Sequence, residues 1–285
     1  LWAFVFYMKM KALFFVIVLV LTAACNRVDR QADATLAGSG DTLSLLYAEG
    51  FDIVYHPGYK EVIVNDPWQP GKVFARYYVV AEDSVVTPAD GSVIRQPVAN
   101  LAVTSSTHFE FLALLDVIER VSGVCSPDLI YNAYIQYQVK NGEIEDLGDA
   151  FNINVEKTLR LQPAMLMMSG YKQDDPYAKR VMQAGIPVVY NNEWMESSLL
   201  ARAEWIKFVA VFFDKEKEAD SIFNFVNESY QSVKARAQAV EKKPTVVSGS
   251  NFRGTWYMPG GNSFMARLFA DAGGDYYYAG DDSKG

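Results

Sequence analysis

From residue 97 onward, short apolar segments alternate with stretches that have the hydrophobic period of a helix. This alternation constrains the fold more than any other feature of the sequence. Strands are predicted at residues 100–103, 164–168 and 186–190. Strands that alternate with helices through short connections form a parallel sheet covered by helices. We therefore expect an α/β lobe over residues 97–213.

A long amphipathic helix is predicted after this lobe. Helices at about 108–121 and 198–213 belong to the lobe itself, and a further helix at 215–240 has apolar side chains at steps of three and four. At about 1.5 Å per residue this last helix measures roughly 39 Å. A helix of that length, within a connecting segment at 214–242, can join two lobes. Its pattern also fits an ordinary surface helix.

A second α/β pattern begins after the long helix. A strand is predicted at residues 245–248, a loop at 249–261 and a helix at 263–272 that ends at Gly273. One strand and one helix cannot cover both faces of a sheet. We therefore interpret residues 243–285 as the start of a second, truncated lobe.

Residues 42–96 have a different pattern from the rest of the chain. Runs rich in β-forming residues are separated by turn residues such as His56-Pro57-Gly58, which predicts a small antiparallel β element ahead of the lobe. The predicted strands are residues 43–48, 51–55, 61–64 and 72–80.

The first 24 residues have the features of an export signal. Lys9 and Lys11 precede a short apolar segment at residues 12–21, and small residues stand before Cys25, as in the cleavage site of a bacterial lipoprotein. We expect lipidation at Cys25. Residues 1–24 are also long and apolar enough to be a membrane-spanning helix, although the two lysines interrupt the apolar run.

A polar segment over residues 25–41 is expected to act as a linker between the lipid and the folded part. Acidic residues outnumber basic ones by 34 to 26, which gives a net charge of −8 and disfavours nucleic acid as a partner. With Cys25 lipidated, Cys125 has no cysteine to pair with, so no intramolecular disulfide is expected.

The sequence lacks the motifs of the common enzyme classes. It contains no G-x-S-x-G, H-E-x-x-H, P-loop or C-x-x-C pattern. The two histidines, His56 and His108, fall in different predicted units, so a protein metal site is not expected. We predict neither an enzyme nor a resident cofactor.

Several segments together resemble one family, the substrate-binding lipoproteins of ABC importers for iron chelates and vitamin B12. These segments are NVEKTLRLQP at 154–163, GIPVVY at 185–190, RAEWIKF at 202–208, WYMPGGNSF at 256–264 and DAGGD at 271–275. The resemblance implies two α/β lobes with parallel sheets, joined by one long helix, with the ligand between them. It also implies an ABC permease and its ATPase as partners, a monomer, and a location in the periplasm or cell envelope.

In such a fold the ligand lies where strand ends and helix starts face the cleft. The polar run Ser105, Ser106, Thr107 and His108 offers hydroxyl and backbone N–H groups for an anionic chelate. Capping of a helix by Ser106 or Thr107 is the alternative. Tyr171 and Trp194 follow strands and could stack on a planar ligand, or equally be part of the core.

The second predicted lobe contributes a polar and aromatic loop. Arg253 could pair with a carboxylate or catecholate of the ligand, or be a solvated loop residue. The candidate ligand-binding residues of this loop are Asn251, Phe252, Arg253, Trp256 and Tyr257.

Asp175 matches a position at which an acidic residue in the family pairs with permease arginines. An aspartate before Pro176 is also a good helix N-cap, and one carboxylate can do both. The leading hypothesis is therefore a lipid-anchored protein that captures an iron–siderophore, haem or cobalamin for an ABC permease. An anchored interaction or scaffold protein of the same fold is the alternative.

Overall fold

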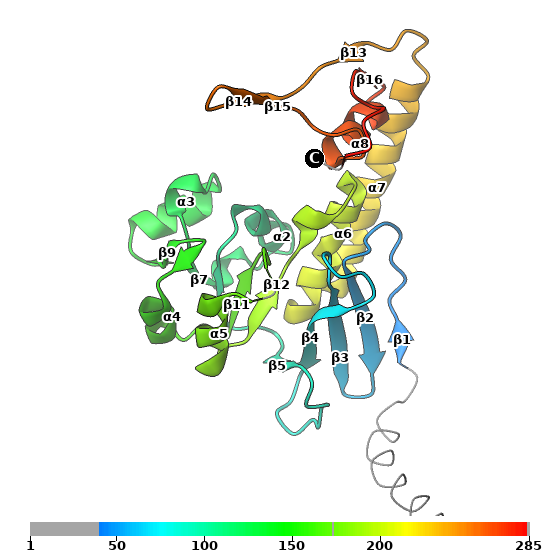
Figure 1. Cartoon of the computed structure of the whole chain (residues 1–285). Helices are drawn as coiled ribbons and strands as arrows, with labels where there is room; N and C mark the ends of the chain where they lie inside the picture. The colour runs from blue at the N-terminus through cyan, green and yellow to red at the C-terminus, as the bar shows by residue number, and fades with distance from the viewer. Residues whose placement is uncertain (1–39, 173, 284–285) are drawn as a thin grey trace, which may run out of the picture. The chain divides into compact units, whose positions relative to one another are not determined.

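The computed structural model describes residues 40–172 and 174–283, nearly all of which lie in one compact unit, Asp41–Gly285. The predicted signal peptide, Cys25 and most of the linker lie outside the described residues. In the part of the chain that is described, no helix combines the length and apolar character needed to cross a bilayer. Figure 1 shows how the elements of this unit are arranged.

The predicted α/β lobe contains a five-stranded sheet in the order β12-β11-β6-β7-β8, and every neighbouring pair is parallel. The residues of β6, β11 and β12 are all buried, which explains why these strands appear as continuous apolar runs. The strands are β6 (Leu101–Val103), β7 (Val121–Val124), β8 (Glu145–Asp146), β11 (Met165–Met168) and β12 (Val188–Tyr190).

Short helices and turns connect these strands (Figure 1). The helix predicted to end near residue 121 stops at Leu114, because Asp116 adopts a left-handed conformation with φ 57° and Val121 already pairs with Leu101. The helices are α2 (Phe109–Leu114), α3 (Ala133–Lys140), α4 (Val155–Leu161) and α5 (Pro176–Gln183), and a hairpin of β9 (Gly148–Asp149) and β10 (Asn152–Ile153) precedes α4.

The N-terminal β element is a second five-stranded sheet, in the order β1-β2-β3-β4-β5. It is antiparallel as predicted up to β4, but β5, which the sequence pattern missed, pairs with β4 in parallel. The strands are β1 (Asp41–Thr42), β2 (Phe51–His56), β3 (Tyr59–Asn65), β4 (Val73–Val80) and β5 (Ser92–Arg95).

The predicted strand at residues 43–48 is wrong, because a buried carboxylate captures the backbone N–H groups of its last three residues. Glu204 accepts hydrogen bonds from the N–H groups of Leu46, Tyr47 and Ala48 at 2.8–3.0 Å. Glu196 accepts those of the next two residues, at 3.1 and 2.9 Å, and the Trp205 indole N–H at 2.9 Å. These N–H groups are consequently unavailable to a strand ladder.

Gly50, at the end of this captured turn, has no room for a side chain. An added Cβ atom would lie 2.7 Å from the Trp205 ring and 3.0 Å from Oε1 of Glu196. The glycine therefore permits the close approach of the turn to the buried indole and carboxylate.

The N-terminal sheet shares one hydrophobic core with the α/β lobe. Phe51 packs against Trp205 with ring centroids 4.8 Å apart, and the same buried cluster includes Leu101 of the parallel sheet. The hydroxyl of Tyr77 accepts the backbone N–H of Tyr190 at 2.9 Å, which links β4 to the edge strand β12. Packing therefore makes this sheet an integral part of the lobe.

The long helix is α7 (Glu216–Gln238), which follows α6 (Leu199–Ala210) and the short turn η5 (Val211–Phe213). Its 23 residues correspond to about 35 Å. Near its start, Ala219 and Phe223 are buried in the core of the lobe. Near its end, the Tyr230 hydroxyl donates to Asp271 of α8 at 2.8 Å. One helix thus contacts the lobe and the C-terminal segment, as the predicted connecting helix requires.

The C-terminal segment contains α8 (Phe264–Asp271) and a parallel pair, β13 (Thr245–Val246) and β16 (Asp275–Tyr276). Together with the parallel sheet and α7, this pattern confirms the predicted fold class. The predicted loop at 249–261 instead contains a hairpin of β14 (Ser250–Phe252) and β15 (Thr255–Tyr257). Its two turn residues, Arg253 and Gly254, both have positive φ, which is the two-residue turn that antiparallel strands favour.

Replacing Glu204 by alanine is expected to destabilise the fold by about 3 kcal/mol. The change leaves three backbone N–H groups without their acceptor and removes one of the two acidic partners of Lys207, whose Nζ lies 3.3 Å from Glu204 and 3.3 Å from Asp220. Urea unfolding of the wild type and the variant measures the loss. Glu228→Ala, at an exposed position of α7, is the control and should change stability by less than about 0.5 kcal/mol. Equal losses in the two variants would contradict the proposed importance of the captured turn.

Candidate functional site

Three loops with polar residues leave the carboxyl-terminal edge of the parallel sheet. They follow β6, β11 and β12, which are neighbours in the sheet. The first begins at Thr104, the second at Ser169 and the third at Asn191, and all three side chains are buried. Loops at this edge form the ligand sites of open α/β sheets. A ligand site is therefore expected at this edge of the sheet.

A buried carboxylate joins the loops after β6 and β12. The Thr107 hydroxyl donates to Oε1 of Glu193 at 2.5 Å, and Nε2 of His108 lies 3.2 Å from Oε2. The loop after β11 also reaches this point, since the Ser169 hydroxyl is 3.5 Å from the same ring nitrogen. Glu193 is 4% exposed and His108 is fully buried. We refer to Thr107, His108 and Glu193 as the Glu193 network.

The surroundings of Glu193 favour its ionised form. Burial alone would raise the pKa of the carboxyl group. The hydrogen bond and charge of His108, with the bond from Thr107, outweigh burial, and the pKa of Glu193 falls below its ordinary value. The network therefore contains a charged, hydrogen-bonded carboxylate.

A second side-chain bond fixes the loops after β11 and β12 to each other. The Asn192 carbonyl oxygen accepts the Gly170 N–H at 2.7 Å. A Cβ atom at Gly170 would lie 3.0 Å from the Phe74 ring and 3.1 Å from this oxygen, so the glycine allows the close approach. The loops that carry Tyr171 and Trp194 are thus tied together at their bases.

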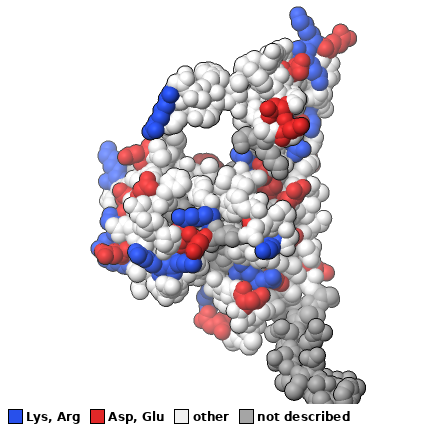
Figure 2. All heavy atoms as spheres, viewed as in Figure 1, with Lys and Arg blue, Asp and Glu red and all other residues white. Residues whose placement is uncertain are grey.

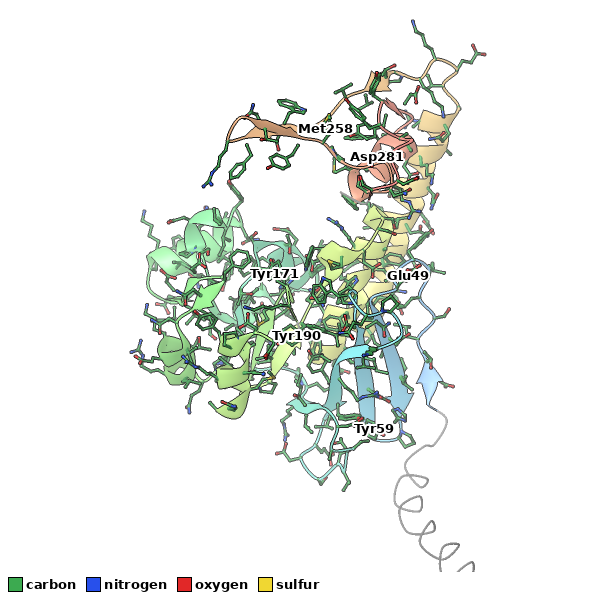
Figure 3. The ribbon with its side chains drawn as sticks, in the orientation of Figure 1. Glu49, Tyr59, Tyr171, Tyr190, Met258 and Asp281 are labelled. Atoms are coloured by element: carbon green, nitrogen blue, oxygen red, sulfur yellow. The ribbon has the colours of Figure 1, made fainter. Side chains whose placement is uncertain are left out.

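Tyr171 and Trp194 form part of a row of rings at this edge. Their ring centroids are 5.4 Å apart with an interplanar angle of 32°, and Phe151 continues the row at 5.0 Å from Tyr171. Phe151 and Tyr171 are 67% and 50% exposed. Figure 3 labels Tyr171 beyond the end of β11. We call these three rings the aromatic row, and neither exposed ring belongs to the core.

Phe151 was missed in the sequence. It lies in the turn between β9 and β10, a hairpin that the hydrophobic pattern did not predict. An aromatic residue beside polar turn residues was the available signal, but nothing in the pattern placed it near Tyr171.

The predicted polar run after β6 divides into accessible and buried residues. Ser106 and Thr107 are exposed and Ser105 is half-buried, whereas His108 is fully buried. The prediction of His108 as a ligand contact is therefore corrected, because its ring faces Glu193 inside the network. The alternative of helix capping is also not supported, since neither the turn at Ser106 nor α2 has a side-chain cap bond.

The candidate residues of the second predicted lobe lie on the β14–β15 hairpin, and all are exposed. The Arg253 guanidinium stands over the Phe252 ring at 5.1 Å, and the Asn251 side chain accepts the Gly254 N–H in the turn. Among the described residues, no ring contact joins this hairpin to the aromatic row. The hairpin residues are Asn251, Phe252, Arg253, Trp256 and Tyr257.

Arg202 connects the loop of Trp194 to the C-terminal segment. Its guanidinium donates to the Trp194 carbonyl at 2.8 Å and stands 3.6 Å from the centroid of the Phe264 ring, at the start of α8. Arg267 of α8 donates to the Ser197 hydroxyl at 3.2 Å. The segment after β12 therefore contacts both α6 of the lobe and α8 of the C-terminal segment.

Asp175 caps α5, which confirms the capping role. Its carboxylate accepts the N–H groups of Tyr177 and Ala178 at 2.8 and 3.1 Å, and Pro176 occupies the first helical position. The carboxylate remains half-exposed.

On the face shown in Figure 2, basic side chains lie interspersed with acidic ones. Lys157 and Arg160 of α4 both pair with Glu145 of β8. Within the described residues, no three His, Cys, Asp or Glu side chains are grouped to hold a metal ion.

The comparison with protein families matches residues 101–285 to a model described as periplasmic binding protein. Among curated proteins, an uncharacterised lipoprotein of Methanocaldococcus jannaschii is 30% identical over 194 residues, which cover 65% of this chain and 46% of the relative. Another uncharacterised protein of this organism is 22% identical, covering 72% of this chain and 64% of its own length. The chain thus spans about half to two thirds of the length of these relatives.

Two solved structures have a similar fold. A possible iron-binding, periplasmic solute-binding protein of Staphylococcus epidermidis has a TM-score of 0.54 at 17% identity and covers 67% of this chain and 70% of its own. The periplasmic haem-binding protein of Vibrio cholerae has a TM-score of 0.50 at 17% identity and covers 63% and 66%. At this level of identity the likeness concerns the fold.

Acidification is expected to remove the stabilising effect of Glu193. Because the pKa of this carboxyl is lowered in the folded protein, its ionisation stabilises the fold fully above the ordinary value of 4.5, and the effect is lost as the pH falls through the folded pKa. The difference in Tm between the wild type and Glu193→Gln should shrink below this pH. Thermal unfolding at a series of pH values measures it. A difference that grows on acidification would contradict the assignment.

Proposed function

The chain belongs to the periplasmic binding protein family, and we propose that it is the substrate-binding lipoprotein of an ABC importer. In this proposal it captures a metal chelate, namely an iron–siderophore, haem or cobalamin, and delivers it to the membrane permease and its ATPase. The similar folds of proteins named as iron-binding and haem-binding support this ligand class.

The observation that carries the proposal is the aromatic row at the carboxyl edge of the parallel sheet. Two of its rings are exposed, although large apolar rings are normally buried. A planar macrocycle or an aromatic catecholate could cover them and recover the free energy of burying their faces. The hydroxyl groups of Ser105, Ser106 and Thr107 are the proposed polar contacts at the same edge.

The β14–β15 hairpin is proposed to supply the opposite side of the ligand site. Its aromatic side chains Phe252, Trp256 and Tyr257 are more than half exposed, and Arg253 adds a positive charge suited to a carboxylate or catecholate. Asn251 holds the turn that presents them.

Lipid attachment at Cys25 is part of the same proposal. The family and the relatives named as lipoproteins point to the cell envelope. A protein held at the membrane by a lipid and a polar linker would remain close to the permease that it serves.

Replacing Tyr171 by alanine is expected to weaken ligand binding roughly tenfold, since it removes the central ring of the aromatic row. The measurement is quenching of tryptophan fluorescence when the full-length protein is titrated with haemin, cyanocobalamin and a ferric catecholate siderophore. Tyr131→Ala, at a site that is 89% exposed and outside the row, is the matched control and should retain wild-type affinity. Absence of quenching by every compound would favour the scaffold alternative.

The two roles of Asp175 can be separated by two substitutions. Asp175→Ala should cost about 1 kcal/mol of stability, whereas Asp175→Asn should cost little because asparagine also caps helices. If the charge docks on the permease, both variants should reduce stimulation of the importer's ATPase in proteoliposomes. Normal stimulation by Asp175→Asn would leave capping as its only role.

A further inference from the structure

We propose that Glu193 is a positioning residue for ligand recognition, which holds Trp194 in the aromatic row by tying the loop after β12 to the loop after β6. The inference deepens the proposed function and rests on it, because it assigns a recognition role to a side chain that the ligand does not touch.

Glu193 joins two loops that are not neighbours at the edge of the sheet. The strands β6 and β12 are separated by β11, so the bonds from Glu193 to Thr107 and His108 cross the end of a whole strand. The Ser169 hydroxyl, at the end of β11, lies 3.5 Å from the same ring of His108. One carboxylate therefore sets the spacing of three loops, which carry the hydroxyl groups, Tyr171 and Trp194.

Two side chains hold the backbone at Trp194. It directly follows Glu193 in the short turn η4 (Glu193–Met195), and its carbonyl accepts the Arg202 guanidinium at 2.8 Å. Glu193 thus connects this backbone to the loop after β6, and Arg202 connects it to α6. The Trp194 indole N–H has no hydrogen-bond partner within the described residues. Its position consequently depends on the backbone and on contact with Tyr171.

A carboxylate offers an acceptor oxygen to each of its two partners, and both oxygens of Glu193 are used in this way. Glutamine keeps the length but replaces one acceptor by a donor and removes the charge. Aspartate keeps the charge but is one methylene shorter, so it cannot reach both partners. Glu193→Gln therefore tests the charge of the carboxylate, and Glu193→Asp tests the length of the side chain.

The charged groups around Glu193 come from three directions. His108 faces it from the loop after β6, Arg202 from α6, and Glu196 lies three residues along its own segment. Burial lowers the pKa of the Arg202 guanidinium, and the charges of Glu193 and Glu196 oppose that effect. Removing the Glu193 charge is thus expected to loosen Arg202 as well as His108, and both changes act on the Trp194 peptide.

The test is a double-mutant cycle of Glu193→Gln and Trp194→Ala in the full-length protein, with affinities for haemin, cyanocobalamin and a ferric catecholate siderophore. Glu193→Gln is expected to weaken binding of the recognised probe about tenfold, which corresponds to about 1.4 kcal/mol. In the Trp194→Ala background the same change should have little further effect, because the ring that Glu193 positions is gone.

A second readout needs no ligand. The indole N–H resonance of Trp194, assigned by its loss in Trp194→Phe, should shift in Glu193→Gln and in Glu193→Asp. Thr107→Val, which removes only one of the two bonds, should shift it less and serves if the Glu193 variants do not fold. Glu228→Gln, at an exposed site on α7, is the control and should leave the resonance and the affinity unchanged.

The outcomes separate this role from the proposed function. If the wild type binds a probe but the two substitutions have additive effects, or the Trp194 resonance does not move, the positioning role is wrong and the binding function stands. If the wild type binds none of the probes, the proposed function is overturned and the recognition role with it.

Discussion

The structure depends on buried carboxylates that each accept hydrogen bonds from distant segments. Glu193, Glu196 and Glu204 lie within twelve residues of one another, each less than 8% exposed, and each joins segments far apart in the sequence. Glu193 binds the loop after β6, and the other two capture the turn that leads into β2. A buried charge is costly unless donors surround it. These contacts therefore select one arrangement of the N-terminal sheet and the parallel sheet, and alternatives would leave the carboxylates unpaired.

In this arrangement, hydrogen bonds hold the loops of the candidate site in place on the parallel sheet. The parallel sheet supplies buried strands, the Glu193 network and the bond from Gly170 to Asn192 fix the loops that follow them, and the rings of Tyr171 and Trp194 lie on these loops. Recognition by stacking needs rings that are already in place, because ordering them on binding would cost conformational entropy. Arg202 also connects the loop of Trp194 to α8, because its guanidinium lies over the Phe264 ring.

Periodicity predicted the parts of the chain in which neighbours along the sequence decide the structure. The strands at Leu101–Val103 and Met165–Met168, the long helix α7 and the cap at Asp175 all follow from local patterns. The predictions failed where a residue far away in the sequence supplies the hydrogen-bond acceptor. Residues 43–48 have the pattern of a strand, but Glu204, 156 to 158 residues away, takes the N–H groups of the last three. His108 has the sequence context of a ligand contact, but Glu193 holds it inside the fold.

The sequence by itself determined the α/β class, three strands of the parallel sheet and the long helix α7, because each depends on a hydrophobic period among residues close together in the chain. Only the tertiary structure decided which of the loop residues are exposed, that Phe151 joins Tyr171 and Trp194, and that Glu193 is buried against Thr107 and His108. The reason is physical: burial and hydrogen bonding depend on which strands become neighbours, and a one-dimensional pattern does not contain those distances.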